Sequence, residues 1–332
     1  MSREPAISVV MSVYNEPEKW LHESIRSILN QTFSDFEFII INDNPGRTKN
    51  REWLEAYKKS DNRIVLLENV ENLGLPKSLN IGLQVARGKY IARMDADDIS
   101  HPLRFEKQYR LMEERQQVIV CGTRARLLGV SDSTTDSWIF ENETDIKARM
   151  LMGSCFHHPS VMIRRSVLEK FGIRYDEEYR QAQDYRLWEV LADYGEFYNL
   201  QERLLDYRIS RRQMSSHAGK AQWRFARMIR KRLVEKWLLK NNICLPLPEV
   251  MDVAQVKVFR HALLVESGMT LSDSACNNFI RALYLSASRG RLSIFLYALR
   301  KGDLRFFARK DIFRFLRYAL HLRHCSPFSA VD

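Results

Sequence analysis

The sequence predicts an α/β fold in which helices cover a mostly parallel sheet, followed by a helical C-terminal extension. Short apolar segments alternate with amphipathic ones over the first hundred residues, and from about residue 220 the pattern is helical. Strands and helices that alternate at this spacing form a parallel sheet with right-handed crossovers, buried on both faces. Such sheets bind ligands at the carboxyl ends of their strands, and three of the four predicted strands end in polar residues.

Four strands and three helices are expected in the first hundred residues. Residues 6–14 are apolar and β-branched, which is typical of a buried strand. The following segment has Leu21, Ile25 and Ile28 at helical spacing, and Gly88 ends the third helix. The expected strands are 6–14, 36–43, 63–69 and 89–95, and the expected helices are 18–31, 51–60 and 75–87.

Beyond residue 100 the pattern is less regular and divides the chain into two parts. The expected elements are a helix at 102–115, a strand at 118–129, a polar loop at 130–145, a strand entering a helix at 157–172, a helix at 183–195 and a helical hairpin at 281–304. We expect an α/β domain over residues 1–217 and a basic, mainly helical region over residues 218–332.

The net charge of +11 is unevenly distributed along the 332 residues. Residues 201–240 contain 12 Lys and Arg against 3 Asp and Glu, whereas the first 200 residues are slightly acidic. A basic protein of pI 9.4 can bind nucleic acid through its phosphates. No nucleic-acid-binding motif accompanies this charge, so we expect no nucleic-acid partner.

The sequence predicts a cytoplasmic protein. No apolar run approaches the roughly 20 residues of a membrane span, and the N-terminus lacks the features of a signal peptide. The five cysteines are scattered, without a C-x-x-C pair. This pattern fits a reducing compartment and disfavours a disulfide framework or a zinc site.

Three carboxylates, Asp95, Asp97 and Asp98, follow the fourth predicted strand directly. Capping of the next helix accounts for one of them but not for three. Mg²⁺ and Mn²⁺ prefer oxygen ligands, and Mg²⁺ is commonly held by one or two carboxylates together with substrate phosphates. The sequence contains no P-loop, so a phosphate ligand would be bound through the cation.

Five motifs occur in the order found in family 2 glycosyltransferases with the GT-A fold: ISVVMSVYNE, FIIINDN, NLGLPKSLNIGLQVARGKYIARMDADDIS, HHPSVMIRRSVL and QDYRLW. The chain resembles the branch that builds bacterial capsule, lipopolysaccharide and O-antigen. The resemblance covers residues 6 to about 215. It implies an inverting transferase that uses a divalent cation (Mn²⁺ or Mg²⁺), a nucleotide-diphospho-sugar, with UDP favoured, and a glycan or lipid-linked glycan acceptor.

The resemblance also assigns the residues expected to bind the donor. Asp43 would bind the base, although its neighbour Asn42 replaces the first Asp of the family's pair. Asp95 and Asp97 form the Asp-x-Asp motif, with Asp97 the direct metal ligand, while Asp98 would orient the donor sugar or cap the next helix. The nucleotide-binding positions are matched by Tyr14, Asn15 and Glu16, and the segment beside the diphosphate and ribose by Asn72, Gly74 and Asn80.

The same resemblance implies Asp184 as the catalytic base, with Gln183 in place of the usual Glu. A carboxylate in this position would take the proton of the acceptor hydroxyl. His158 matches a histidine on the acceptor side. Residues 207–217 match a loop that can close over the donor, in which Arg208, Arg211 or Arg212 would contact phosphate and His217 would add a metal contact.

The sequence leaves two alternative functions open, together with the role of the C-terminal helices. A metal-dependent sugar nucleotidyltransferase would also use carboxylate-held Mg²⁺, but the N-terminal segment lacks the Gly-rich, basic loop of such enzymes. A non-enzymatic nucleic-acid-binding protein is the other alternative. Residues 223–240 and 305–323 predict helices with apolar and cationic faces, which either contact the cytoplasmic face of the inner membrane or pack against the catalytic domain.

Overall fold

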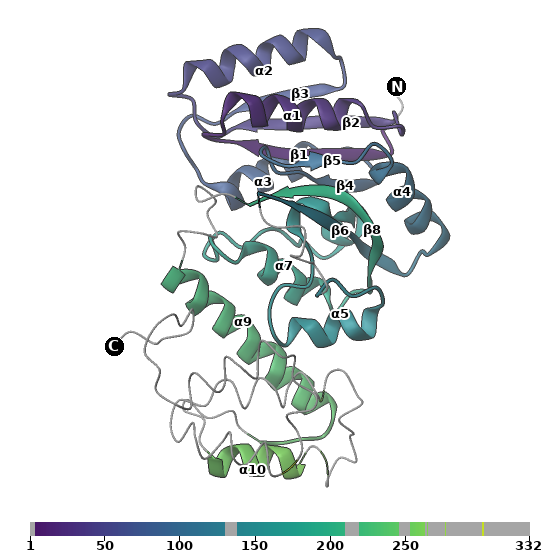
Figure 1. Ribbon diagram of the computed structural model, residues 1–332, viewed down its shortest axis with the longest axis vertical. Helices are drawn as coiled ribbons and strands as arrows, with labels where there is room; N and C mark the ends of the chain where they lie inside the picture. The colour runs from purple at the N-terminus through teal and green to yellow at the C-terminus, as the bar shows by residue number, and fades with distance from the viewer. Residues whose placement is uncertain are drawn as a thin grey trace. The chain divides into compact units, whose positions relative to one another are not determined.

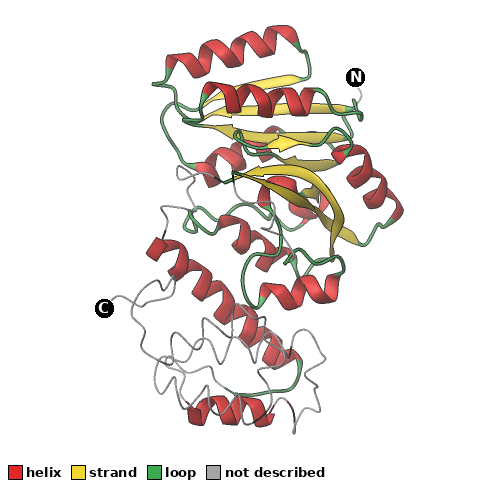
Figure 2. Ribbon diagram, in the orientation of Figure 1, coloured by secondary structure: helices red, strands yellow, loops and turns green. Residues whose placement is uncertain are grey.

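The computed structural model describes residues 4–129, 138–209, 219–245 and 253–262, together with residues 264, 276 and 301. The chain divides into two compact units, Met1–Ile229 and Arg230–Asp332. The first unit contains the sheet, as the yellow strands in Figure 2 show. The functional division at residue 217 stays a prediction.

The N-terminal part of the sheet confirms the predicted strand–helix alternation (Figure 1). The strands are parallel neighbours in the order β3-β2-β1-β4, so their carboxyl ends meet at one edge. The strands are β1 Ile7–Val13, β2 Phe36–Asn42, β3 Ile64–Glu68 and β4 Tyr90–Arg93, and the helices are α1 Glu18–Leu29, α2 Thr48–Ser60 and α3 Leu75–Val85.

The sheet continues beyond β4 in the order β7-β6-β8-β5. Strand β7 is antiparallel to both β4 and β6, whereas β6 and β8 are parallel, so β4, β6 and β8 run in one direction. The elements are β5 Ile99–Ser100, α4 Arg104–Glu114, β6 Val118–Leu128, α5 Glu143–Met150, the 3₁₀ turn η1 His158–Ser160, β7 Met162–Arg164, α6 Arg165–Lys170, α7 Gln183–Leu191 and β8 Glu196–Arg208.

Strand β8 is the longest element that the sequence did not predict. Exposed residues Glu202 and Arg203 interrupt its apolar positions, and its register with β6 is irregular. It therefore shows neither strict alternation nor an apolar run, the two signals that reveal a strand. The expected loop at 207–217 was wrong at its start, because Tyr207 and Arg208 are the last residues of β8.

Two smaller expectations were also wrong. The polar loop at 130–145 ends early because α5 begins at Glu143, where the Asn142 side chain caps the helix by accepting from the Asp145 N–H. Asp98 does not cap α4, since that helix begins at Arg104 after Leu103.

The core lies on both faces of the sheet, which explains the uninterrupted apolar strands. Alternate residues of β1, including Val9 and Met11, pack in one cluster with Leu21 and Ile25 of α1 and with Phe105 of α4. Helix α3 packs against β1 and β2 on the opposite face, which receives the intervening residues of both strands. The two-sided cover leaves the strand ends as the place where polar side chains can gather.

The elements described in the second unit are helices. Helix α9 Gly219–Lys240 crosses the boundary between the units, and α10 Val253–His261 lies within the second. Residues 281–300 and 302–332, on which the predicted hairpin and the second amphipathic helix fall, lie outside the described residues. Among the helices that are described, none combines the length and apolarity required to cross a membrane.

A buried carboxylate fixes the connection from α3 into β4. Glu37 of β2 accepts from the Ser8 hydroxyl (2.7 Å) and from the Arg87 N–H (2.7 Å). The Ser8 Oγ in turn accepts from the Gly88 N–H at 2.7 Å. A Cβ at Gly88 would lie 2.4 Å from the Ser8 nitrogen, so this turn requires glycine for close approach.

We predict that Gly88→Ala lowers the free energy of unfolding by about 1–3 kcal/mol, because overpacking forces the backbone of β1 and the turn apart. Urea denaturation measures the change. Gly46→Ala is the matched control, since the nearest atom to its Cβ is 3.8 Å away. Equal stability of the two variants would contradict the close-packing argument.

Candidate active site

The polar ends of β1, β2 and β4 meet at one edge of the sheet, as the sequence predicted. The carbonyl oxygen of Tyr14 accepts from the side-chain amides of Asn44 (3.2 Å) and Asn50 (2.9 Å), which joins the ends of β1 and β2. Tyr14 and Asn15 are exposed here, whereas Glu16 is half-buried and accepts from the Tyr14 N–H at 2.8 Å. Burial raises the pKa of Glu16, and the nearby charge of Asp95 raises it further.

Asp43 shapes the loop that follows β3. Its carboxylate accepts from the Asn69 amide (2.7 Å) and from the backbone N–H groups of Leu73 (2.8 Å) and Gly74 (2.9 Å). Gly74 has φ +84°, a conformation that favours glycine, and its N–H also donates to Asn72 Oδ1 at 2.9 Å. Three residues predicted at the nucleotide side therefore lie together.

The structure gives a physical reason for asparagine at position 42. Its Nδ2 donates to Glu68 (3.0 Å), while its Oδ1 accepts from Asn44 N–H (3.2 Å) and Asn50 Nδ2 (3.3 Å). An ionised aspartate accepts only and would repel Glu68. The Asn42 amide therefore satisfies all three neighbours in this chain.

The carboxylates that follow β4 form a tight acidic cluster of Asp95, Asp97 and Asp98. One oxygen from each residue lies within 4.8 Å of the others. Burial, together with the charges of Asp95 and Glu16, raises the pKa of Asp97 to about 7. The cost of removing like charges from water indicates that the cluster needs a counter-charge.

Asp98 is fully buried, and its two oxygens differ in their surroundings. Its Oδ1 accepts from the Arg208 N–H at 2.8 Å, whereas its buried Oδ2 has no hydrogen-bond partner in the described part of the chain. Burial and the charges of Asp95 and Asp97 hold the pKa of Asp98 well above its usual range. An orphaned carboxylate oxygen beside two further carboxylates fits a hard cation such as Mg²⁺ or Mn²⁺.

Two buried arginines lie beneath the acidic cluster, and sequence reasoning missed both. Arg93 is 2% exposed and pairs with Asp95. Arg104 is fully buried and donates to the backbone oxygens of Pro159 (2.8 Å) and Arg93 (3.1 Å). Burial and the charge of Arg93 lower the pKa of Arg104 to about 9. The one available signal was a cation at position 93 that interrupts an apolar strand.

Arg208 joins the end of β8 to the acidic cluster and to α1. Its Nε donates to the Asp97 carbonyl oxygen (2.8 Å) and its Nη2 to Glu23 (2.9 Å), while the guanidinium lies 4.7 Å from the centre of the Trp20 ring. Neither Glu23 nor Trp20 was predicted. The phosphate contact expected of Arg208 stays a prediction, and Arg211, Arg212 and His217 lie outside the described residues.

Asp184 lies in the first turn of α7, next to the acidic cluster. Its Oδ2 accepts from the Ser154 hydroxyl at 2.9 Å. Burial raises the pKa of Asp184, and the charge of Asp95 contributes in the same direction. Gln183 is buried beside it, with an Oε1 that makes no hydrogen bond to the described residues. A half-buried carboxylate oriented by a hydroxyl has the properties of a general base.

His158 and Asn80 both form hydrogen bonds to Tyr175. The His158 Nε2 lies 2.8 Å from the Tyr175 hydroxyl, and burial together with the charge of Arg93 holds the pKa of His158 well below its usual range. Asn80 makes two 2.9 Å hydrogen bonds to the backbone N–H and carbonyl of Tyr175. Asn80 therefore holds the segment that orients a neutral His158.

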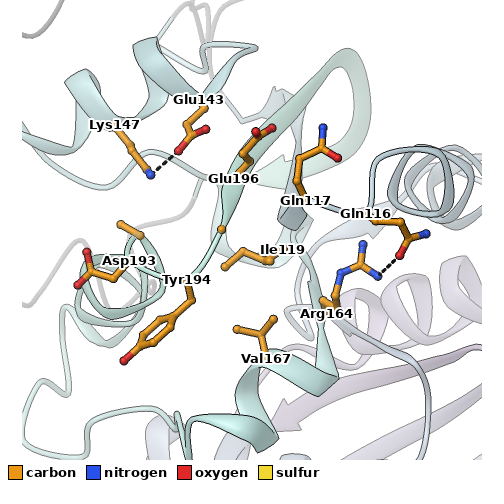
Figure 3. Close-up of a pocket in the computed structure, with 12 residues that line it drawn as sticks. Gln116, Gln117, Ile119, Glu143, Lys147, Arg164, Val167, Asp193, Tyr194 and Glu196 are labelled. Atoms are coloured by element: carbon orange, nitrogen blue, oxygen red, sulfur yellow. Dashed lines mark hydrogen bonds and ion pairs between the residues drawn. The ribbon is translucent and has the colours of Figure 1, made fainter.

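A separate hollow of about 510 Å³ lies at the opposite edge of the sheet (Figure 3). It is lined by residues at the starts of β6 and β8 and by Arg164, at the end of antiparallel β7. The Glu143–Lys147 ion pair and the 3.3 Å hydrogen bond from Arg164 to Gln116 border it. This hollow holds none of the predicted site residues.

Comparison with known proteins shows the family to which the chain belongs. The sequence profile of glycosyl transferase family 2 matches residues 8–172. An uncharacterized glycosyltransferase of Methanocaldococcus jannaschii is 36% identical over 265 residues, which covers 79% of this chain and 88% of the relative. The O-antigen biosynthesis glycosyltransferase WbnJ of Escherichia coli is 35% identical over 209 residues, or 61% of this chain and 79% of that protein.

The fold agrees with a solved structure. Residues 1–349 of Staphylococcus aureus TarS, crystallised in complex with UDP, superpose with a TM-score of 0.60 at 16% identity, covering 98% of this chain and 94% of TarS 1–349. At this identity the likeness shows the fold, which is that of the GT-A glycosyltransferases. Together with the sequence relatives, it shows that the chain is an enzyme that belongs to glycosyltransferase family 2.

Proposed function

We propose that this enzyme transfers a sugar, with inversion, from a nucleotide-diphospho-sugar to a hydroxyl of a glycan acceptor during surface polysaccharide synthesis. The observation that carries the proposal is the convergence of the acidic cluster, the Asp43-bound loop and Asp184 at one sheet edge. The TarS structures, which contain UDP or UDP-GlcNAc, support a UDP-sugar as donor, and the O-antigen relative supports a role in surface polysaccharide synthesis. Family membership decides against the nucleotidyltransferase and the nucleic-acid-binding protein.

The donor would lie across the ends of β1, β2 and β4. Tyr14, Asn15 and Glu16, with Asp43, Asn72 and Gly74, would bind the nucleoside end. Asp95 and Asp97 would hold a divalent cation, with Asp98 supporting them or the donor sugar. A bound Mg²⁺ or Mn²⁺ would neutralise the diphosphate, which the carboxylates alone repel. His217, which lies outside the described residues, stays a predicted further ligand.

The reaction would be a single displacement in which Asp184 acts as the base. The acceptor oxygen forms a bond to the anomeric carbon as the bond from that carbon to the diphosphate oxygen breaks. Asp184 takes the hydroxyl proton, and the nucleoside diphosphate leaves with the bonding electron pair. The Ser154 hydroxyl, 2.9 Å from Asp184, would keep the carboxylate aimed at the acceptor. His158, neutral and bonded to Tyr175, would line the acceptor side.

We also propose a reversible contact with the cytoplasmic face of the inner membrane, which suits a lipid-linked acceptor. Helix α9 exposes Arg224, Arg227 and Lys231 at helical spacing, together with Met228, which is 41% exposed. Cations beside an apolar side chain suit an anionic membrane surface.

Asp97→Asn should weaken Mn²⁺-dependent binding of UDP by at least roughly tenfold, since even outer-shell partners of a metal contribute about 10–100-fold. Calorimetry with and without Mn²⁺ measures the affinities. Asp193→Asn, which changes an exposed carboxylate at the opposite edge, should bind as the wild type does. Affinities that are the same with and without the cation in all three proteins would contradict the metal site.

Asp184→Asn should retain donor binding but lower the transfer rate by about 10²–10⁴-fold, because the amide cannot accept the proton. Ser154→Ala should cause a smaller loss, since it removes only the hydrogen bond that orients the base. A coupled assay for released UDP measures both rates. Transfer by Asp184→Asn at the wild-type rate would assign the base to another residue.

The membrane contact predicts co-sedimentation with phosphatidylglycerol vesicles that decreases as salt is added. Each Lys or Arg near an anionic surface contributes roughly 1 kcal/mol, so changing Arg224, Arg227 and Lys231 together to Gln should abolish binding. Changing Lys58 and Lys59, near the end of α2, to Gln is the control. Failure of the wild type to bind these vesicles would refute the contact.

A further inference from the structure

Three aromatic rings form a row beside the proposed active site. The ring centres of Trp138 and His157 are 4.8 Å apart, and those of His157 and Tyr207 are 5.4 Å apart. His157 is 7% exposed, whereas Trp138 and Tyr207 are only half-buried. The central ring is thus a packed support, and the two outer rings keep accessible surface. We refer to Trp138, His157 and Tyr207 as the aromatic row.

The Tyr207 end of the row reaches the reacting centre. Tyr207 precedes Arg208, whose backbone N–H binds Asp98. Burial raises the pKa of the Tyr207 hydroxyl, and Asp95, Asp98, Asp97 and Asp184 raise it further, in that order. The Tyr207 hydroxyl is therefore close enough to interact electrostatically with both the acidic cluster and the proposed base Asp184. It keeps its proton and can donate a hydrogen bond.

The Trp138 end of the row is connected to Asp184 through the last turn of α5 and the short segment that follows it. The Arg149 guanidinium lies 5.4 Å from the Trp138 ring centre, and the Arg149 carbonyl oxygen accepts from the Met152 and Gly153 N–H groups. The next residue is Ser154, which binds Asp184. Arg149 therefore contacts the Trp138 ring, and Ser154, five residues later in the same turn, contacts the proposed base Asp184.

The order of strands separates this row from the donor. The nucleotide residues follow β1 and β2, on one side of β4. Trp138 follows β6 in the chain, His157 precedes β7 and Tyr207 lies near the end of β8, and these three strands are on the other side of β4. The acidic cluster after β4 lies between the two groups. A ligand held by the row would therefore approach Asp184 from the side opposite the nucleoside.

We propose that Trp138, His157 and Tyr207 form one wall of the acceptor subsite and that this wall binds a pyranose ring of the acceptor glycan. The inference rests on the proposed function and adds the class of acceptor group. A pyranose has an apolar C–H face and a rim of hydroxyls. Half-exposed aromatic rings with a polar tip, next to carboxylates, suit both features. An acceptor built only of open-chain polyol units would lack the apolar face.

The test measures UDP release with a panel of p-nitrophenyl pyranosides as acceptors, using the UDP-sugar that binds best among UDP-glucose, UDP-galactose and UDP-N-acetylglucosamine. At least one pyranoside should accelerate release by the wild type above the rate with water. Trp138→Ala should raise the KM for that pyranoside by about tenfold, the scale of one aromatic contact. Calorimetry should show a donor affinity within twofold of the wild type, which also reports correct folding.

Conservative and distant variants complete the test. Trp138→Phe and Tyr207→Phe retain a ring and should recover most of the acceptor affinity that Trp138→Ala and Tyr207→Leu lose. Tyr194→Ala is the matched control, because Tyr194 is 40% exposed, lies 4.1 Å from the Phe171 ring and borders the hollow at the opposite edge.

Two results would overturn the subsite. The first is that no pyranoside accelerates UDP release by the wild type. The second is that Trp138→Ala leaves the KM for the pyranoside unchanged, or raises it no more than Tyr194→Ala does. Failure to bind any of the three UDP-sugars would instead contradict the proposed UDP-sugar donor.

Discussion

The mutual repulsion of three carboxylates is the constraint on which the rest of the site depends. Their oxygens converge within 4.8 Å at the end of β4, where burial makes the charges costly. The protein offsets this from below with Arg93, which pairs with Asp95, and from the side with the Arg208 N–H, which binds Asp98. One Asp98 oxygen still has no hydrogen bond from the described residues. In the proposed function, a bound divalent cation would supply the missing positive charge and would join the acidic cluster to the diphosphate of the donor.

The order of strands in the sheet places the proposed donor residues and the proposed acceptor residues on different sides of the acidic cluster. Parallel strands β1, β2 and β4 bring the Tyr14 and Asp43 segments to the same edge as the acidic cluster. Beyond β4, antiparallel β7 and the long pair β6–β8 bring Asp184, His158 and the aromatic row to the other side. The proposed inverting reaction requires this arrangement, because its nucleophile and its leaving group must lie on opposite sides of the reacting carbon.

Buried polar side chains hold these surfaces in place. Arg104 ties the backbone of Arg93 to Pro159, next to His158, and Asn80 pairs with the backbone of Tyr175. Arg104 and Asn80 each form a hydrogen bond to a segment more than fifty residues away in the sequence. Loss of either side chain would leave buried polar groups unpaired, which is costly. Substitutions there act on geometry, since the positions of His158 and the acidic cluster depend on them.

The sequence by itself determined the parallel half of the fold and the chemistry of its edge. Uninterrupted apolar strands can only be buried on both faces, and polar residues after β1, β2 and β4 must then meet. Beyond β4 the sequence also predicted α4, β6, the strand and helix of β7 and α6, and α7, but only the tertiary structure decided how the strands among them pair. Strand β8 has interrupted alternation and an irregular register with β6, so only pairing reveals it. The roles of Arg93, Arg208 and Trp138 depend on partners from distant segments, and a one-dimensional pattern carries no information about which distant groups become neighbours.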